Sequence, residues 1–394
     1  MIGVVNTIAQ FAKESIQEFK DFERFYSAEN NDYRRLVFYA ESSIFYRYYE
    51  DYIEYILQNS KLGISYITSQ PDDEIFKLRD PHIRPFYFKH MLSAVFRKLD
   101  SKVLVLANPD LNNSYMKRAP DPVQHVLVFR GISSTHQGYR TAAFDHYDCL
   151  LCVGQYQIDE IRKREELYKL RAKELILTGY PLAERLQRQY QIYEQSAGKR
   201  QRKLCLIAPT WAPMLPESSI MDNCIETLIE KLKDKPFDVW IRPHPEYLKR
   251  NVGRINNLRK LLAATANVSL QTDLSSMECL FEADVLITDH SSIAIDYSLA
   301  TGRPVVYIDT PTRTDNPEWQ KLGLEPVENA YRDKLGKRLA LSEVGNIAAE
   351  VEYLLDHPAE FSAKIPQLRD ELVAHWQCAA EVGGRHILKL CGEE

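Results

Sequence analysis

The sequence lacks long hydrophobic runs and an excess of basic residues. None of its apolar stretches approaches the ~20 residues that a membrane-spanning helix needs, and no secretory signal is evident. Lys and Arg number 50 against 55 Asp and Glu, which gives a formal net charge of −5. Proteins that hold nucleic acid through its phosphates need a basic surface. We therefore expect no nucleic-acid partner.

Several common cofactor and metal signatures are also missing. There is no GxGxxG turn and no P-loop, which argues against a dinucleotide dehydrogenase and a P-loop kinase. No DxD stands out after a strand, and no group of His and carboxylate residues has metal-ligand spacing. We therefore expect neither a cofactor nor a metal, so that arginine, hydroxyls and helix N-termini would stabilise a leaving group.

Cysteine is infrequent, and its spacing is uninformative for metal binding. The seven cysteines are scattered, and only Cys149 and Cys152 form a CxxC, inside the apolar run CLLCVG. No second CxxC or His pair follows at zinc spacing. The pattern predicts reduced thiols in the core, which fits a cytoplasmic protein.

The chain does contain a near-continuous alternation of apolar strands and helical patterns. Such alternation is typical of the α/β class, with parallel sheets covered by helices on both faces. At 394 residues with 45% hydrophobic side chains, the chain is long enough for two domains. Strands are expected at Leu36–Ala40, Ile64–Thr68, Val103–Ala107, His125–Phe129, Cys149–Val153, Glu174–Thr178, Leu204–Ala208, Asp238–Ile241, Val268–Gln271, Asp284–Thr288 and Val305–Ile308. Helices are expected at Phe45–Leu57 and at about 218–233, 254–264, 275–282, 292–300, 342–356 and 365–390.

A polar, basic run at 196–203 separates the two halves and predicts a linker. We expect an N-terminal, acceptor-side Rossmann-like domain at 1–198 and a C-terminal, nucleotide-donor-binding one at 199–370. Residues 371–394 would form a helix that packs back on the N-terminal domain. In two doubly wound domains facing across a cleft, the ligand sits at the carboxyl ends of the strands.

The most informative stretch is DVLITDHSSIAIDYSLATGRPVVYID, residues 284–309. It reads as a strand, a polar turn, a helix that Gly302 ends, and a second strand. The turn, with Asp289, Ser291 and Ser292, places hydroxyls and backbone N–H groups at a helix N-terminus. Such a terminus binds phosphate or carboxylate, although a simple helix cap is an equal alternative for the turn taken alone.

Two more polar motifs follow expected strands of the second half. One is APTW at 208–211, with Thr210, and the other is RPHP at 242–245. Arg242 offers a fork of donors suited to phosphate, and His244 could donate to a phosphate oxygen or shuttle a proton. A surface ion pair and a turn histidine are the alternatives. Three motifs at equivalent strand ends of one sheet should share a site.

In the first half, FRGISSTHQGY at 129–139 also follows a strand. It carries Gly131 for close approach and His136 for acid–base chemistry. An ordinary loop is the alternative for this segment.

With these residues in hand, the chain resembles the CDP-glycerol glycerophosphotransferase family, the teichoic-acid-type primases and polymerases. The resemblance rests on APTW, RPHP, ADVLITDHSSIAIDY at 283–297 and TGYP at 178–181. It implies the two-domain glycosyltransferase-B fold. It also implies that Thr210, Arg242, His244, Asp289, Ser291 and Ser292 bind the donor, with Asp289 either fixing the turn or touching the donor.

Two departures from the family pattern concern the reaction. The family carries a His-Gly pair, a proposed general base, where this chain has Arg130 and Gly131, so we assign catalytic roles to His136, His244 and Arg130. His290 stands where the family usually has Tyr.

The resemblance implies transfer of a glycerol-phosphate or related polyol-phosphate unit from a CDP-linked donor to a hydroxyl of a cell-surface glycan, teichoic-acid-like or lipid-linked acceptor. Three alternatives stay open. They are a glycosyltransferase using a nucleotide sugar in capsule or lipopolysaccharide synthesis, a nucleotide-sugar 2-epimerase, and a non-catalytic nucleotide- or glycan-binding protein. The epimerases carry Ser-Gly-Gly where this chain has Ser291-Ser292-Ile293, which counts against that alternative.

The N-terminus carries an amphipathic stripe of Ile8, Phe11, Ile16 and Phe19. Its polar face mixes lysine with glutamate and lacks the basic excess that anionic lipids attract. We expect the stripe to dock on the protein's own core. The alternative is peripheral association with the inner face of the cell membrane.

Overall fold

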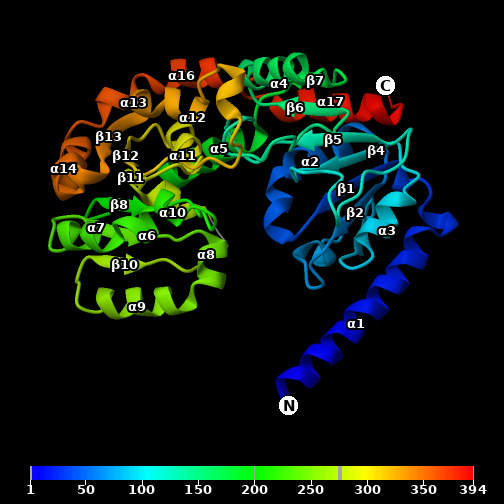
Figure 1. Ribbon diagram of the computed structural model, residues 1–394, viewed down its shortest axis with the longest axis horizontal. Helices are drawn as coiled ribbons and strands as arrows, with labels where there is room; N and C mark the ends of the chain where they lie inside the picture. Colours follow the sequence, from blue (N-terminus) through cyan, green and yellow to red (C-terminus); the bar gives the residue numbers. More distant parts are fainter. Residues whose placement is uncertain (1, 197, 199, 274–276, 394) are drawn as a thin grey trace. The chain divides into compact units, whose positions relative to one another are not determined.

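The computed structural model describes residues 2–196, 198, 200–273 and 277–393, with side chains from residue 10 onward. The chain forms two compact units, which are described separately (Figure 1). Unit 1 comprises Met1–Arg130, Tyr139–Leu182 and Val373–Glu394, and unit 2 comprises Gly131–Gly138 and Ala183–Leu372. The short segment Gly131–Gly138 thus packs with the second unit, although its neighbours on both sides belong to the first.

Unit 1 is built on a seven-stranded parallel sheet in the order β3-β2-β1-β4-β5-β6-β7. Its strands are β1 (Leu36–Ala40), β2 (Ile64–Thr68), β3 (Ile83–Tyr87), β4 (Val103–Leu106), β5 (Gln124–Val128), β6 (Cys149–Cys152) and β7 (Glu174–Leu177). Its helices are α1 (Ile2–Phe25), α2 (Glu50–Asn59), α3 (Leu92–Arg97), α4 (Gln155–Tyr168) and α17 (Ala379–Cys391). α5 (Pro181–Ser196) begins in this unit and continues in unit 2.

Unit 2 contains a six-stranded parallel sheet in the order β10-β9-β8-β11-β12-β13. Its strands are β8 (Leu204–Ile207), β9 (Asp238–Ile241), β10 (Val268–Leu270), β11 (Val285–Thr288), β12 (Val305–Asp309) and β13 (Gly336–Ala340). Its helices are α6 (Ile220–Asn223), α7 (Ile225–Leu232), α8 (Pro245–Arg250), α9 (Val252–Leu262), α10 (Glu278–Glu282), α11 (Ile293–Thr301), α12 (Val327–Ala330), α13 (Arg332–Leu335), α14 (Ile347–Asp356), α15 (Ala359–Ser362) and α16 (Ile365–Leu372).

The expected α/β class with two parallel sheets is confirmed, and every strand expected from the sequence is present within one or two residues of its bounds. Two strands were missed, and both lie at the end of a sheet. β3 contains Pro85, which has no N–H to give to a ladder and is tolerated at an edge. β13 reads GKRLA and has only two buried residues, so it lacks an apolar run.

The C-terminal helical segment expected at 365–390 is interrupted. α16 ends at Leu372 and α17 begins at Ala379. Between them His375 and Gln377 have φ angles of 47° and 79°, in the left-handed region that a right-handed helix cannot continue through. α17 packs on α2 in unit 1, where a Cβ on Gly383 would lie 2.3 Å from Tyr52 Cε1, so only glycine fits.

The expectation that the N-terminal apolar stripe docks on the core is wrong for its described members. Phe11, Ile16 and Phe19 on α1 are 55%, 59% and 58% exposed, and the side chain of Ile8 lies outside the described residues. The opposite, acidic face of the helix is buried instead. Glu18 Oε1 accepts from Met91 N at 2.9 Å, and Asp21 Oδ2 accepts from Tyr87 N at 2.9 Å. Backbone N–H groups at and after edge strand β3 need acceptors, and the carboxylates supply them.

Among the described residues no helix is long and apolar enough to cross a membrane. Cys149 and Cys152 are buried, free thiols, as the sequence predicts. Two expected features fall partly outside the described residues. They are positions 275–276 of the expected helix at 275–282 and positions 197 and 199 of the expected linker.

Candidate functional site

The three motifs of the second half follow neighbouring strands of one sheet. β9, β8 and β11 lie side by side and run parallel, so RPHP, APTW and the Asp289 turn meet at one edge. β8 to β10 extend the sheet in one direction, and β11 to β13 extend it in the other. The order therefore reverses between β8 and β11, the switch point at which doubly wound folds bind ligands.

Asp289 ties two of these strand ends together. Its Oδ1 accepts from Thr210 N at 2.8 Å and from His290 N at 2.7 Å, and its Oδ2 accepts from Ile220 N at 2.9 Å. The side chain is 1% exposed, and burial raises the pKa of Asp289 to about 6 although the three N–H donors favour the charged form. Its carboxylate therefore fixes the turn and holds the loop after β8 against it.

Ser291 and Ser292 precede α11 and are partly exposed. Ser292 is the N-cap residue, yet its hydroxyl makes no capping hydrogen bond. The N–H groups of Ala294 and Ile295 donate to Ser291 O and Ser292 O at 3.3 and 3.1 Å, which leaves the two serine hydroxyls at the positive end of the helix dipole. Gly302, with φ of 70°, ends the helix as the sequence predicts. The turn has the donors that an anionic group requires.

Arg242 follows β9 directly and is 8% exposed. Its Nη1 and Nη2 donate to Met277 Sδ at 3.7 and 3.8 Å. A thioether is a weak acceptor, so an incoming phosphate oxygen would replace these contacts with stronger, charge-assisted ones. The structure thus places a guanidinium at the same sheet edge as the two serines.

His244 is exposed and stacks on Trp211, with the ring centroids 5.8 Å apart and the planes at 14°. Its Nδ1 accepts from Glu246 N at 3.2 Å, because a backbone N–H can only donate. Partial burial of the ring lowers the pKa of His244 to about 4, although the residue as a whole is exposed. The neutral ring therefore carries its proton on Nε2, and His244 presents a hydrogen-bond donor.

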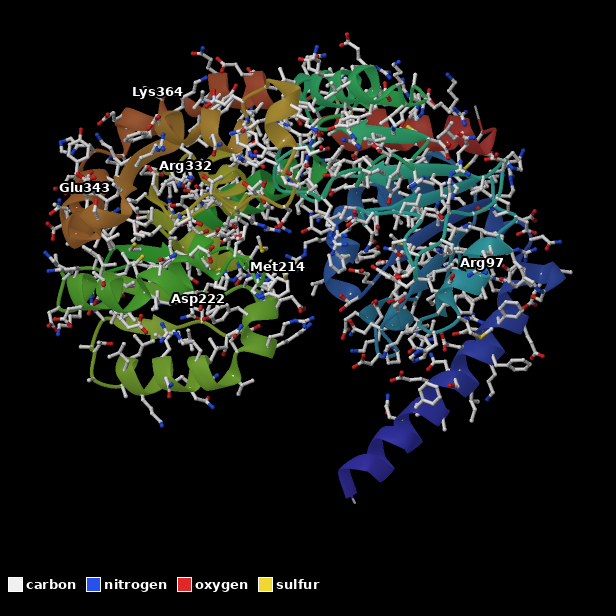
Figure 2. The ribbon with its side chains drawn as sticks, in the orientation of Figure 1. Arg97, Met214, Asp222, Arg332, Glu343 and Lys364 are labelled. Atoms are coloured by element: carbon white, nitrogen blue, oxygen red, sulfur yellow. The ribbon has the colours of Figure 1, made fainter. Side chains whose placement is uncertain are left out.

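His290, the departure from the family pattern, is a structural bridge. Its Nε2 donates to Thr310 O at 3.0 Å, and its Nδ1 accepts from Arg332 Nη1 at 3.2 Å. Burial and the neighbouring Arg332 cation lower the pKa of His290 to about 4, so the ring is neutral at pH 7. Arg332, labelled in Figure 2, also pairs with Asp309 at 3.1 Å. Both nitrogens of His290 are therefore occupied from within unit 2.

The segment Gly131–Gly138 forms part of unit 2 and lies against the serine turn. A Cβ on Gly131 would lie 3.1 Å from Ser292 Oγ, so a larger residue there would press on the hydroxyl. Ser134 Oγ accepts from Val327 N at 2.7 Å and anchors the segment. Glycine at position 131 lets the two loops approach closely.

His136 lies in this segment but is only 3% exposed. Its Nε2 donates to Leu324 O at 3.1 Å, and its ring centroid lies 6.2 Å from that of Trp319. In the neutral ring the basic nitrogen is then Nδ1. The structure gives His136 a clear anchoring contact, and its assignment as general base stays a prediction.

Arg130 belongs to unit 1, at the end of β5. Its Nε donates to Ala107 O, and its guanidinium carbon lies 4.5 Å from the centroid of the Phe45 ring. Six of the residues assigned from the sequence lie at one sheet edge of unit 2: Thr210, Arg242, His244, Asp289, Ser291 and Ser292. His136 lies in the segment Gly131–Gly138 of the same unit.

Sequence reasoning missed Asp296 in the first turns of α11. It lies four residues after Ser292, on the same face of the helix, and is 8% exposed. Its Oδ1 has no hydrogen-bond partner among the described residues, and burial raises the pKa of Asp296 to about 7. A carboxylate in a helix with no other charged residue was the available signal, since an uncompensated buried charge costs stability.

Replacing this carboxylate should therefore stabilise the fold in a pH-dependent way. Because the pKa in the folded state is raised from 3.8 to about 7, the stability that Asp296 contributes is present at low pH and lost as pH rises towards 7. Asp296→Asn is expected to raise the free energy of unfolding by a few kcal/mol, at most about 4, at pH 8, and by less at pH 5. Denaturant unfolding at both pH values measures this. Asp370→Asn, at an exposed site, is the control, and an equal gain at both pH values would contradict the prediction.

Comparison with known proteins places the chain in a family. The family model described as CDP-glycerol:poly(glycerophosphate) glycerophosphotransferase matches residues 22–312. The teichoic acid glycerol-phosphate primase of Bacillus subtilis (strain 168) is 24% identical over 234 residues, which cover 55% of this chain and 58% of the primase. The chain thus spans less than two thirds of this curated relative.

Solved structures show the same fold at low identity. The wall teichoic acid polymerase TagF superposes with a TM-score of 0.62 at 15% identity, covering 100% of this chain and 98% of that one. A TagF variant soaked with CDPG gives a TM-score of 0.58 at 16% identity, covering 98% of this chain and 95% of that one. The UDP-GlcNAc 2-epimerase from Neisseria meningitidis, bound to UDP-GlcNAc, gives a TM-score of 0.57 at 14% identity, covering 90% of this chain and 99% of that one.

These likenesses agree with the glycosyltransferase-B fold that the sequence motifs imply. The family match includes β8, β9 and β11 with all three polar motifs that follow them. It also includes the segment that carries Arg130 and His136. The chain belongs to the CDP-glycerol:poly(glycerophosphate) glycerophosphotransferase family.

Proposed function

We propose that this chain transfers a glycerol-phosphate or related polyol-phosphate unit from a CDP-linked donor to a hydroxyl of a teichoic-acid-like or other cell-surface glycan acceptor. The observation that carries the proposal is the set of anion-binding donors at adjacent strand ends of unit 2. Arg242, the Nε2–H of His244 and the Ser291–Ser292 turn at the start of α11 all lie at this edge. Such donors suit a pyrophosphate.

The proposed reaction is an attack on phosphorus. The acceptor hydroxyl forms a new P–O bond to the polyol phosphate, the bond to the bridging pyrophosphate oxygen breaks, and CMP leaves with that oxygen and the electron pair. Arg242, His244 and the hydroxyls of Ser291 and Ser292 would stabilise the charge that develops on the leaving phosphate. The proton of the acceptor hydroxyl goes to a general base, for which His136 is our assignment.

A donor screen tests the substrate class. Thermal unfolding is measured with CDP-glycerol, CDP-ribitol, CMP, UDP-sugars and GDP-sugars, and CMP release is followed with a glycerol-phosphate oligomer as acceptor. We expect the cytidine compounds to stabilise the protein most and CDP-glycerol to yield CMP only when acceptor is present. A preference for uridine compounds would favour either a glycosyltransferase of capsule or lipopolysaccharide synthesis or an epimerase. Binding of a donor without CMP release would favour a non-catalytic protein.

We further propose that the chain works at the inner face of the cell membrane, where α1 binds the lipid surface. The exposed side chains of Phe11, Ile16 and Phe19 support this placement, since three large apolar groups on one helix seldom remain in water. Lys13 and Lys20, both exposed on α1, could contact anionic headgroups. The seven free cysteines fit a reducing compartment.

Sedimentation with vesicles containing anionic lipid tests this surface. Replacing Phe11 and Phe19 by serine is expected to lower the bound fraction about 10-fold or more, because each buried ring contributes roughly 1.5–3 kcal/mol. The double variant Tyr115→Ser/Leu167→Ser, which removes two exposed side chains of similar size elsewhere in unit 1, should bind like the unmodified protein. An equal loss of vesicle binding in both double variants would argue against a role for α1.

A further inference from the structure

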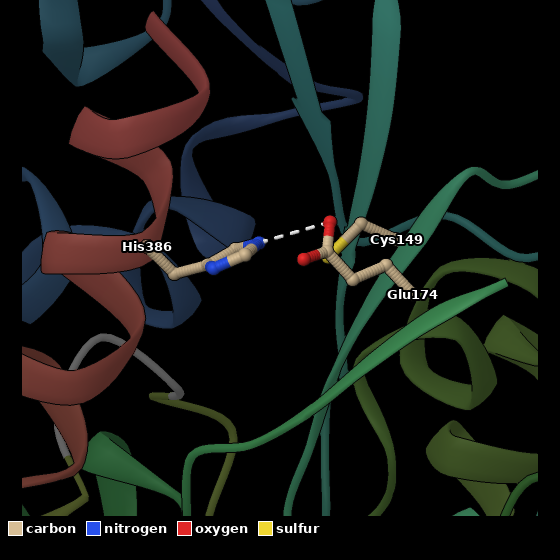
Figure 3. A group of neighbouring side chains, drawn as sticks. All are labelled: Cys149, Glu174 and His386. Atoms are coloured by element: carbon tan, nitrogen blue, oxygen red, sulfur yellow. Dashed lines mark ion pairs between the residues drawn. The ribbon is translucent and has the colours of Figure 1, made fainter. Parts of the chain in front are cut away.

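A second group of reactive side chains lies in unit 1 and is used by none of the steps above. Cys149 begins β6, Glu174 begins β7, and His386 lies on α17 (Figure 3). One ligand atom from each, the thiol sulfur, a carboxylate oxygen and a ring nitrogen, all lie within 4.8 Å of one another. Cys149 and Glu174 are partners in the parallel register of β6 and β7, so their side chains leave the same face of the sheet.

The contact between His386 and Glu174 is close but leaves the buried histidine nitrogen without a hydrogen bond in the described part of the chain. His386 Nε2 lies 3.3 Å from Glu174 Oε2, as the dashed line in Figure 3 marks, and the imidazole side chain is 9% exposed. The buried Nε2 nevertheless has no hydrogen-bond partner among the described residues, so the pair lacks hydrogen-bond alignment. Two ligands at about 2.0 Å from a tetrahedral Zn²⁺ lie about 3.3 Å apart, which this separation matches.

The electrostatics of the group also fit a cation. A neutral imidazole offers a nitrogen lone pair for coordination, and His386 Nε2 is buried beside Glu174 Oε2. A thiolate at buried Cys149 would lie beside the Glu174 carboxylate and would need a compensating positive charge. A bound divalent cation would supply that compensation and release the thiol proton to water.

We propose that Cys149, Glu174 and His386 bind a zinc-class divalent cation. Thiolate, imidazole and carboxylate together form a donor set that Zn²⁺ accepts in tetrahedral geometry, whereas Mg²⁺ and Ca²⁺ take oxygen ligands. Glu174 also lines a cavity of about 430 Å³ together with Arg118, Asp148 and Lys173. A water molecule would complete the tetrahedral set as the fourth ligand.

The metal would connect the C-terminal helix to the sheet of unit 1. His386 is far from Cys149 and Glu174 in the sequence, and α17 otherwise contacts the unit mainly through α2. A metal that binds the folded state but not the unfolded state stabilises the folded state by mass action. The metal would thus join α17 to the sheet of unit 1, and its ligands include none of the donor-binding residues of unit 2.

Cobalt substitution tests the ligands directly. The full-length chain, freed of any purification tag, is treated with chelator, desalted and titrated with Co²⁺ under reducing conditions. We expect saturation at one ion per chain, with the near-ultraviolet charge-transfer band of a cobalt–thiolate bond and the visible absorption of a tetrahedral ion. Cys149→Ser should abolish the charge-transfer band, and His386→Gln should weaken binding about 100-fold or more, whereas Cys152→Ser, three positions along the same strand, should leave both unchanged.

Thermal unfolding with Zn²⁺ provides the second readout. Zinc should raise the midpoint of the unmodified protein and of Cys152→Ser by several degrees and leave Cys149→Ser, Glu174→Gln and His386→Gln unmoved. Comparing each variant with and without metal separates metal binding from any loss of packing. A cobalt–thiolate band that survives Cys149→Ser, no band in the unmodified protein, or an equal zinc shift in all variants would overturn the proposal.

Discussion

Arg242→Ala is expected to weaken binding of CDP-glycerol by about 10- to 100-fold and to lower kcat/KM at least as much. The guanidinium is 8% exposed just after β9, and its terminal nitrogens donate to Met277 Sδ, a weak acceptor. A charge-assisted hydrogen bond to phosphate is worth roughly 1.5–3 kcal/mol, which corresponds to that range of affinity. Calorimetric titration with CDP-glycerol and with CMP measures the change.

A matched variant controls for the removal of charge. Arg259 lies on the exposed surface of α9 in the same unit, so Arg259→Ala changes the net charge equally without touching the strand ends. We expect donor affinity to be unchanged in Arg259→Ala and lost in Arg242→Ala. If Arg242→Ala binds CDP-glycerol as tightly as the unmodified protein, the assignment of the donor site to this sheet edge is wrong.

His136→Ala is expected to lower turnover about 100-fold or more while donor affinity changes little. A general base acts in the transition state and contributes typically 10²–10⁴-fold, so its loss affects kcat rather than binding. Because Nε2 donates to Leu324 O, the basic nitrogen of the neutral ring is Nδ1. The initial rate of CMP release at saturating donor, together with donor affinity, separates the two quantities.

The burial of His136 requires a control for loop anchoring. Ser134 holds the same segment through the hydrogen bond from Val327 N, so Ser134→Ala loosens the segment without removing a base. If Ser134→Ala reduces turnover as much as His136→Ala, then His136 acts by positioning the loop. If Arg130→Ala abolishes activity and His136→Ala does not, the base assignment is wrong.

Much of the donor side could be read from the sequence. The run DVLITDHSS contains a buried strand followed directly by a polar turn, and the same order of apolar run and polar motif precedes Thr210 and Arg242. Parallel strands put their carboxyl ends on one edge, so the motifs had to meet if the strands were neighbours. In the structure β8 pairs with both β9 and β11, so the three strands are neighbours and the motifs that follow them lie at one edge.

Side-chain roles at this edge could not be read in the same way. The sequence left two roles for Asp289, which were fixing the turn and contacting a ligand. In the structure its carboxylate accepts from three backbone N–H groups of separate segments. His290 looked like a change at the ligand, yet Thr310 and Arg332 occupy both its nitrogens. All of these contacts except the one with His290 N join residues tens of positions apart, and local spacing carries no record of them.

The sequence by itself determined eleven strands, their parallel direction within α/β units and the polar motifs that follow them. These follow from apolar periodicity and turn chemistry, which act between residues close in the chain. Only the tertiary structure decided which face of α1 is buried, where Gly131–Gly138 packs, and that Cys149, Glu174 and His386 come together. The physical reason is that burial and side-chain coordination depend on which distant segments supply partners. An amphipathic helix whose acids bond an edge strand leaves its apolar face outward, against the expectation from periodicity alone.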